Sequence, residues 1–445
     1  MTSKKMNTPP ANPNVLTPIG GVAFAITVLA LASQAFAAPP PPTLKVKPLP
    51  EGTDGVASVA TSLVTGDFNG DGRPDLASAG RVRQAGAQMA LPALWFTQIT
   101  HTWDSDLYML AHEGFGGCVN AFTVDSRPEI TFVLGGYVND ANGRRQAAIW
   151  SAIDSGVDRT HPDLCLLGTP PNTIGEVLDI ETIEIGSHLI IVVCGRVTDV
   201  TGGSHAVVWA GTPEHGFSRD FLPPLVAGGD STATSLALVM SDDADGYFAG
   251  TAPASVVGAS SDADGNPQAV LWRRKNGHWQ PPKPLGNLPG GSQSNAYTLM
   301  LGPNVNDIGG NAMLVGGQAE NWNMEMVPVF WLRGSGAARV TPLPLLAEWT
   351  SGRITDIIDG TSNTMMVGEA SGPQGSVAAL FSHSDQVQQA YDLNTLANDL
   401  PPGIKLRVAN AIARYMDDLV GWNLVGTATD QTGTPHAYVA RLYMD

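Results

Sequence analysis

Two sequence features, which we call the aromatic mark and the glycine mark, recur along almost the whole of this chain at a nearly constant distance from each other. A short apolar stretch ends in an aromatic residue seven times, at intervals of 50 to 63 residues, and 12 to 15 residues before each aromatic an aliphatic run ends in glycine. A repeat of this length predicts units that bury their hydrophobic surface against one another. The aromatic residues are Trp95, Trp150, Trp209, Trp272, Trp331, Phe381 and Tyr438, and the glycines are Gly80, Gly135, Gly195, Gly258, Gly316, Gly368 and Gly426.

Each repeat contains four short segments with strand patterns, bounded by Gly, Asn, Asp and Pro. A four-stranded sheet cannot bury both faces alone, whereas a closed ring of such sheets buries them all. We therefore predict an all-β fold, a β-propeller of seven blades with four antiparallel strands each, with six or eight blades as alternatives. The segment PLPEG at 48–52 has no preceding strand with which it could form a blade. We therefore expect it to complete the last blade, which ends with HAYVARL at 436–442.

The N-terminal residues have the features of a signal peptide. Lys4 and Lys5 precede an apolar run at 19–32, and small residues precede a predicted cleavage between Ala37 and Ala38. This divides the chain into a signal peptide (1–37), a proline-rich tether (38–46) and a propeller domain (47–445). The apolar run is too short to span a bilayer comfortably, so no membrane span is expected after cleavage. The predicted location is secreted or periplasmic.

The charge of the chain narrows the class of partner. The formal net charge is −17, and removal of residues 1–37 lowers it to −19. Such an acidic surface repels nucleic acid and favours cations, and we expect a monomer. The odd count of cysteines (Cys118, Cys165 and Cys194) leaves two alternatives, one disulfide with a buried thiol or three buried thiols.

A candidate metal loop lies in DFNGDGRPD at 67–75. Oxygen side chains at alternate positions can wrap a hard cation such as Ca²⁺, and a glycine at position 6 allows the sharp turn. Position 12 is Ser78, which excludes an EF-hand, and DADGN at 262–266 is a partial echo. The predicted ligands of a structural calcium ion are Asp67, Asn69, Asp71, the backbone carbonyl of Arg73, and Asp75.

Two family resemblances follow from these motifs. Segments such as VNDANGRRQAAIW and LVGTATDQTGTPHAYV resemble the HAF repeat of bacterial extracellular proteins. The His-Ala signature of that repeat appears at His205 and His436. The resemblance covers most of the chain and implies the fold and export, but no settled activity. The loop at 67–75 resembles the calcium loop of FG-GAP propeller blades, as in integrin-type propellers.

A third resemblance is judged coincidental. AIDSGVDRTHPDL at 152–164 is similar to the aspartate box of subtilisin-like proteases, with Asp154 as the orienting acid. The nearest serine box, at Gly360 to Ser362, lacks the proline of that family, and the chain lacks its alternating strands and helices. The repeat instead places Asp154 in a turn between two strands.

These observations favour a secreted, non-catalytic binding module that presents loops to a protein or glycan partner. The alternative is a propeller hydrolase or lyase acting in the central funnel, which a cluster of perturbed carboxylates or histidines there would favour. A lectin would need exposed aromatic residues at equivalent blade positions. The repeated tryptophans look like core residues, whereas Trp279 and Trp322 lie in polar surroundings and are the better candidates for an exposed surface.

Overall fold

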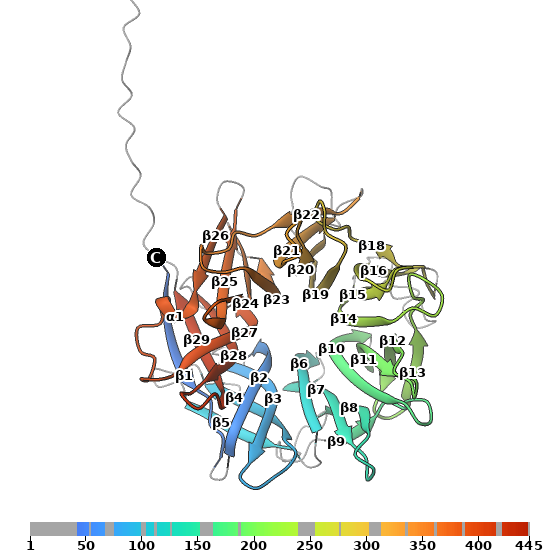
Figure 1. The fold of residues 1–445 in the computed structure, drawn as a ribbon. Coiled ribbons are helices and arrows are strands. Elements are labelled where there is room, and N and C mark those ends of the chain that lie inside the picture. Colours follow the sequence, from blue (N-terminus) through green and yellow to red (C-terminus); the bar gives the residue numbers. More distant parts are fainter. Residues whose placement is uncertain are drawn as a thin grey trace, which may run out of the picture. The chain divides into compact units, whose positions relative to one another are not determined.

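Seven antiparallel sheets stand around one axis, with the innermost strand of each sheet facing the centre (Figure 1). This arrangement confirms the predicted seven-bladed β-propeller. The computed structural model describes residues 42–443 except for 53–54, 67–74, 99–103, 111–113, 125–126, 152–162, 186–187, 239–253, 276, 302–312, 334–336, 360–362, 385–387 and 415–420.

The strands of each blade follow one another from the axis outward. Blade 1 contains β2 (Gly55–Gly66), β3 (Asp75–Gln84), β4 (Leu91–Gln98) and β5 (Asp104–Met109). Blade 2 contains β6 (Gly114–Val124), β7 (Arg127–Asn139), β8 (Arg145–Ser151) and β9 (Asp163–Leu166). Blade 3 contains β10 (Ile174–Ile185), β11 (His188–Thr198), β12 (Ser204–Thr212) and β13 (Gly216–Phe221). Blade 4 contains β14 (Ser231–Leu238), β15 (Ala254–Ser261), β16 (Pro267–Lys275) and an outer strand broken into β17 (His278–Trp279) and β18 (Lys283–Pro284).

The remaining blades have the same order. Blade 5 contains β19 (Ser294–Leu301), β20 (Met313–Glu320), β21 (Met326–Arg333) and β22 (Arg339–Pro342). Blade 6 contains β23 (Ser351–Asp359), β24 (Thr364–Gly372), β25 (Gly375–His383) and β26 (Gln388–Asp392), and it is followed by the single turn of helix α1 (Leu393–Leu396). Blade 7 contains β27 (Lys405–Arg414), β28 (Gly421–Thr429), β29 (Pro435–Tyr443) and β1 (Thr43–Pro48).

The two ends of the propeller meet in blade 7. Strand β1 pairs antiparallel with β29, from Thr43 opposite Tyr443 to Pro48 opposite Tyr438, so the first and last strands lie side by side (Figure 1). An N-terminal segment therefore completes the last blade, as predicted, but the pairing strand is Thr43–Pro48, and only Pro48 belongs to the predicted segment at 48–52. The strand begins at Thr43, four residues before the predicted start of the domain at residue 47, because six residues pair with the edge of β29.

The glycine mark has a steric cause. In each blade the innermost strand bulges, and one of its carbonyl oxygens comes close to the glycine of the second strand. A Cβ atom at Gly258 would lie 1.9 Å from the oxygen of Thr232, and one at Gly426 would lie 2.1 Å from that of Val408. In blades 2 and 5, where two glycines are adjacent, the glycine in this position is the second, Gly136 or Gly317, one residue after the predicted one.

The aromatic mark forms the core between strands and blades. All seven residues lie on third strands and are at most 2% exposed, so the interpretation as core residues is confirmed. The glycine makes room for the aromatic ring, since a Cβ atom at Gly80 would lie 2.9 Å from Trp95. The indole Nε1 of Trp95 donates to the carbonyl of Pro50 at 2.8 Å, which ties the ring to a connecting segment.

Five hairpins between second and third strands share one loop. An Asp or Asn at its first position accepts hydrogen bonds on Oδ1 from the backbone amides two and four residues later, which fixes the turn. Asp262 in the echo DADGN belongs to this set. The first residues of the loops are Asp140, Asp199, Asp262, Asn321 and Asp430.

The three cysteines are free thiols in this fold. Cys118, Cys165 and Cys194 form no disulfide, and Cys118 and Cys194 are buried while Cys165 is partly buried. Of the two alternatives, that of three buried thiols agrees better, although Cys165 is only partly buried. Within the described ranges, the structure contains no helix of the length and apolarity needed to cross a membrane.

Candidate functional site

The inner strands enclose a polar cavity on the axis of the ring. Its volume is about 300 Å³, and all seven blades contribute to its wall. In every inner strand the register slips by one residue, so a β-bulge turns an extra residue toward the cavity. These residues are Thr61, Gly117, Leu178, Thr234, Tyr297, Thr355 and Asn410.

The bulge residues join neighbouring blades. The hydroxyl of Thr234 donates to the carbonyl of Ala296 in the next blade at 2.8 Å, and Thr355 donates in the same way to Ala409 at 2.6 Å. Across the closure, the side-chain amide of Asn410 donates to the carbonyl of Ala60 at 2.6 Å. The polar residues on the axis therefore hold the ring together.

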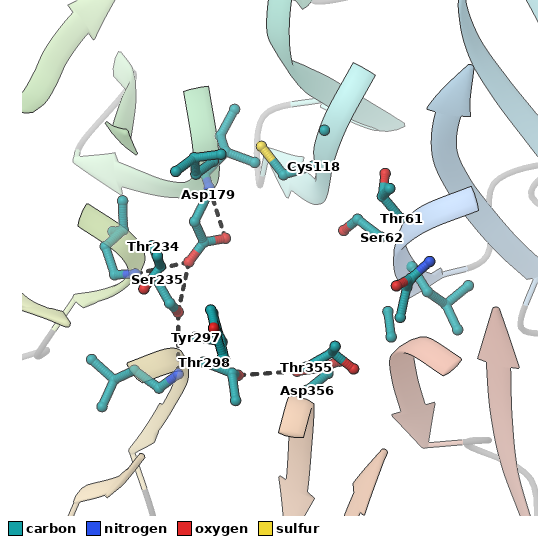
Figure 2. Close-up of a pocket in the computed structure, with 18 of the residues that line it drawn as sticks. Thr61, Ser62, Cys118, Asp179, Thr234, Ser235, Tyr297, Thr298, Thr355 and Asp356 are labelled. Carbon is teal, nitrogen blue, oxygen red and sulfur yellow. Dashed lines mark hydrogen bonds between the residues drawn. The ribbon is translucent and has the colours of Figure 1, made fainter. Parts of the chain in front are cut away.

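Asp179 follows the bulge of blade 3 and reaches into blade 4. Its Oδ2 accepts hydrogen bonds from the amide of Leu236 at 2.8 Å and the hydroxyl of Ser235 at 2.9 Å, while Oδ1 accepts from the amide of Ile180 (Figure 2). Desolvation by burial raises the pKa of the Asp179 carboxyl from 3.8 to about 6, although these hydrogen bonds act in the opposite direction.

Asp356 has the equivalent position in blade 6. Its Oδ2 accepts from the amide of Ile412 in blade 7 at 2.9 Å, and its Oδ1 accepts from the amide of Ile357 at 2.8 Å. Oδ1 also accepts from the hydroxyl of Thr298 in blade 5 at 3.2 Å (Figure 2). Burial is again the largest cause that raises its pKa to about 6, and the charge of Asp179 adds to it.

These two carboxyls are the perturbed groups that an enzyme in the funnel would require, and the sequence motifs did not reveal them. Both oxygens of each are occupied by backbone amides, which fits a structural bridge at least as well as a general acid or base. The sequence offered only a weak signal, since each aspartate is followed by isoleucine, in EVLDIE and RITDII, and the first of these segments contains two further acids. Burial also raises the pKa of the cavity-lining Cys118 thiol, which makes it a poor nucleophile at neutral pH.

The predicted calcium ligands lie on the connection between β2 and β3. Asp67, Asn69, Asp71 and Arg73 are outside the described residues. Asp75 is the first residue of β3, is 4% exposed and pairs with Gly66, the last residue of β2. The ends of the eight-residue loop are therefore held together at a buried carboxylate, which fits a loop that wraps a cation.

The two histidines that the sequence assigned to a HAF-like signature each contact the first aspartate of a hairpin loop. His205 Nε2 lies 3.3 Å from Oδ2 of Asp199, and His436 Nε2 lies 3.5 Å from Oδ2 of Asp430. In blade 4 the equivalent Gln268 donates to Asp262 at 2.9 Å, so the contact does not require a titratable group. Hydrogen bonds from the loop and from His436 lower the pKa of Asp430 to about 2.

The subtilisin-like interpretation gains no support from the fold, because an all-antiparallel ring lacks the alternating strands and helices of that family. Asp154 and Ser362 lie outside the described residues, on connections between strands. A serine, an acid and a histidine do meet at the ring closure. There the hydroxyl of Ser58, 1% exposed, donates to Glu51 at 2.5 Å, and Glu51 contacts His436 at 3.0 Å. The histidine does not accept from the serine, which differs from a catalytic triad.

The two candidate surface tryptophans have different environments. Trp279 is partly buried against blade 4, with the guanidinium of Arg274 6.0 Å from its ring. Trp322, at the tip of the β20–β21 hairpin, is 76% exposed. In the other four loops of this type the equivalent residues are Ala141, Val200, Ala263 and Gln431. The exposed aromatic is therefore not repeated among them, contrary to the pattern of a lectin with one aromatic per blade.

Comparisons with known proteins found one short family match and distant similarity to solved structures. The FG-GAP repeat model matches residues 59–82, which contain the loop at 67–75, and no curated protein matches the chain. Among solved structures, a protein of unknown function from Dyadobacter fermentans is 9% identical, with 91% of this chain and 98% of that chain covered and a TM-score of 0.44. The WD40 domain of SCAP from fission yeast is 10% identical, with coverages of 90% and 98% and a TM-score of 0.36. Xylan β-1,4-xylosidase from Bacillus halodurans is 11% identical, with both coverages 88% and a TM-score of 0.30. The FG-GAP match is confined to one segment in blade 1 of the seven-bladed propeller.

Proposed function

We propose that this protein is an exported, non-catalytic binding module with a structural calcium ion, whose partner is a protein. The observation that supports this proposal is that both oxygens of each carboxyl on the axis, Asp179 and Asp356, already accept hydrogen bonds. Asp179 and Asp356 each use both oxygens to bind backbone amides, and both reach into the following blade. The axis then serves as a scaffold, which leaves the loops for recognition.

A screen for activity tests this proposal directly. The purified protein is incubated with chromogenic esters, glycosides, peptides and polyuronates, and it should turn over none of them. Turnover that is lost in Asp179→Asn, in a variant that is still folded, would instead support a hydrolase or lyase in the funnel. This second candidate is favoured by one observation, the raised pKa of two carboxyls that face the same cavity.

We propose calcium at the loop of residues 67–75 because the donor set is built from hard oxygens and the loop is closed by the pair Gly66–Asp75. A bound ion would stabilise the fold by about 2.7 kcal/mol at a concentration 100 times its Kd. We expect added Ca²⁺ to raise the melting temperature relative to EGTA in the wild type and in the control Asp264→Asn, but not in Asp71→Asn. Equal melting in Ca²⁺ and EGTA would eliminate the site.

Export is proposed from the signal-peptide features of the N-terminal 37 residues and from the HAF-type repeats. In these repeats, His205 and His436 contact the hairpin loops. Expression of the full chain in a bacterium, followed by fractionation and mass spectrometry, should find a chain that begins at Ala38 outside the cytoplasm. An intact N-terminus on cytoplasmic protein would contradict this proposal.

A further inference from the structure

The hairpin loop of blade 5 differs from its sisters in two ways. Trp322 is 76% exposed and Met324 is 82% exposed, the latter being the highest value among the exposed large hydrophobic residues. Met324 also has a φ of +61°, in the left-handed region that costs free energy for any residue with a side chain. The four sister loops have glycine at this position, namely Gly143, Gly202, Gly265 and Gly433.

The tip of this loop is held in place although it is exposed. The side chain of Asn321 accepts from the amides of Asn323 at 2.8 Å and Glu325 at 3.0 Å, which fixes the turn. Gly290, on the connection before β19, leaves room for Trp322, because a Cβ atom there would lie 3.2 Å from the Cα and Cβ atoms of Trp322. Little conformational freedom of the loop backbone is therefore left to lose on binding.

The charges around the tip indicate what it can bind. Glu320 and Glu325 flank it, and hydrogen bonds from Ser292 lower the pKa of Glu320, which keeps that carboxylate ionised. No lysine, arginine or histidine occurs in residues 285–293 or 313–326. Carboxylates attract Lys and Arg side chains by charge, and an exposed tryptophan ring attracts them by cation–π contact.

From these observations we infer that Trp322 and Met324 form an anchor for a short protein segment that combines apolar with basic side chains. Trp and Met are enriched in the centres of protein interfaces, and an exposed pair on a fixed turn is suited to that role. A single hairpin tip covers less area than a standard interface of about 800 Å² per partner, so the contact belongs to the weak, transient class. The inference rests on the proposed binding function and specifies its partner.

A random dodecapeptide display library provides the probe. Selection on the wild-type protein should enrich peptides that contain Lys or Arg beside Leu, Met or aromatic residues. The most enriched peptide, once synthesised, should bind at least ten times more weakly to Trp322→Ala and to Met324→Gly. Its affinity for Val200→Ser, which alters the equivalent exposed residue of blade 3, should equal that for the wild type. Met324→Gly should also melt at a higher temperature than the wild type, because glycine adopts positive φ without strain. Loss of binding in a more stable variant cannot arise from unfolding.

The opposite results overturn the inference. No enrichment, peptides without basic residues, or equal binding by Trp322→Ala would each refute the anchor. Binding to a glycan array or to phosphatidylcholine vesicles that is lost in Trp322→Ala would assign the tip to another class of ligand. Peptide binding that does not depend on Trp322 refutes the anchor but leaves the binding function intact, whereas turnover in the activity screen contradicts the binding function itself.

Discussion

The axial carboxyls predict an unusual dependence of stability on pH. Asp356 has a pKa of about 6 in the folded ring, against 3.8 for an ordinary aspartate. A folded-state pKa above the unfolded one means that the folded state binds more protons between these values, so the contribution of Asp356 to stability is greatest below pH 4 and is lost as the pH rises through 6. The difference is worth up to about 3 kcal/mol, an upper limit because the carboxyl is only partly buried at the cavity wall.

Asp356→Asn isolates this effect. The asparagine removes the charge, but its NH₂ group must face the amide of either Ile357 or Ile412, which leaves a buried donor without an acceptor. That costs about 1–3 kcal/mol at every pH. The variant should therefore be clearly less stable than the wild type at pH 4, and this deficit should shrink by up to about 3 kcal/mol, or reverse, by pH 7.5.

Urea denaturation of both proteins at pH 4, 5, 6 and 7.5 measures the difference, and the exposed Asp264→Asn serves as a control that should show no such trend. Comparison at each pH cancels the titration of groups common to both proteins. A deficit that is constant, or that grows as the pH rises, would mean that the amide donors stabilise the carboxylate more than burial penalises it. The reasoning about Asp356 would then be wrong.

Three further predictions concern the repeat marks and the ring closure. Gly258→Ala should cost more than about 3 kcal/mol in urea denaturation because the backbone must move, whereas Gly265→Ala, with open space and a φ of +83°, should cost about 1–2 kcal/mol; equal costs would contradict the steric argument. Deletion of residues 38–48 should expose the edge of β29 and produce aggregation in light scattering, so a monomeric, equally stable product would show that β1 is dispensable. His205→Gln should change stability by less than about 0.5 kcal/mol because Gln268 makes the equivalent contact with Asp262 in blade 4, and a larger loss would assign the histidine a role of its own.

The sequence alone was sufficient for the number of blades, their four strands and the closure. The blades and their strands depend on features that are local to one repeat, since the glycine faces a bulge in the adjacent strand and the aromatic follows on the next strand of the same sheet. Steric demands of this kind recur with the period of the chain. The closure was inferred because the segment at 48–52 has no preceding strand with which to pair. The one-residue offset at Gly136 and Gly317 arose because two adjacent glycines satisfy the same pattern. The calcium loop was also visible in the sequence, and it remains a prediction there.

Only the tertiary structure decided the role of the aspartates on the axis and of the two tryptophans outside the repeat, Trp279 and Trp322. Asp179 and Asp356 meet partners that lie 56 to 58 positions away in the chain, so their saturation with hydrogen bonds depends on how neighbouring blades are placed. Trp279 and Trp322 have similarly polar neighbours in the sequence, but Trp279 packs onto its blade and Trp322 stands at the tip of a hairpin. Exposure and hydrogen bonding across blades are properties of packing between segments, and the pattern within one segment does not contain them.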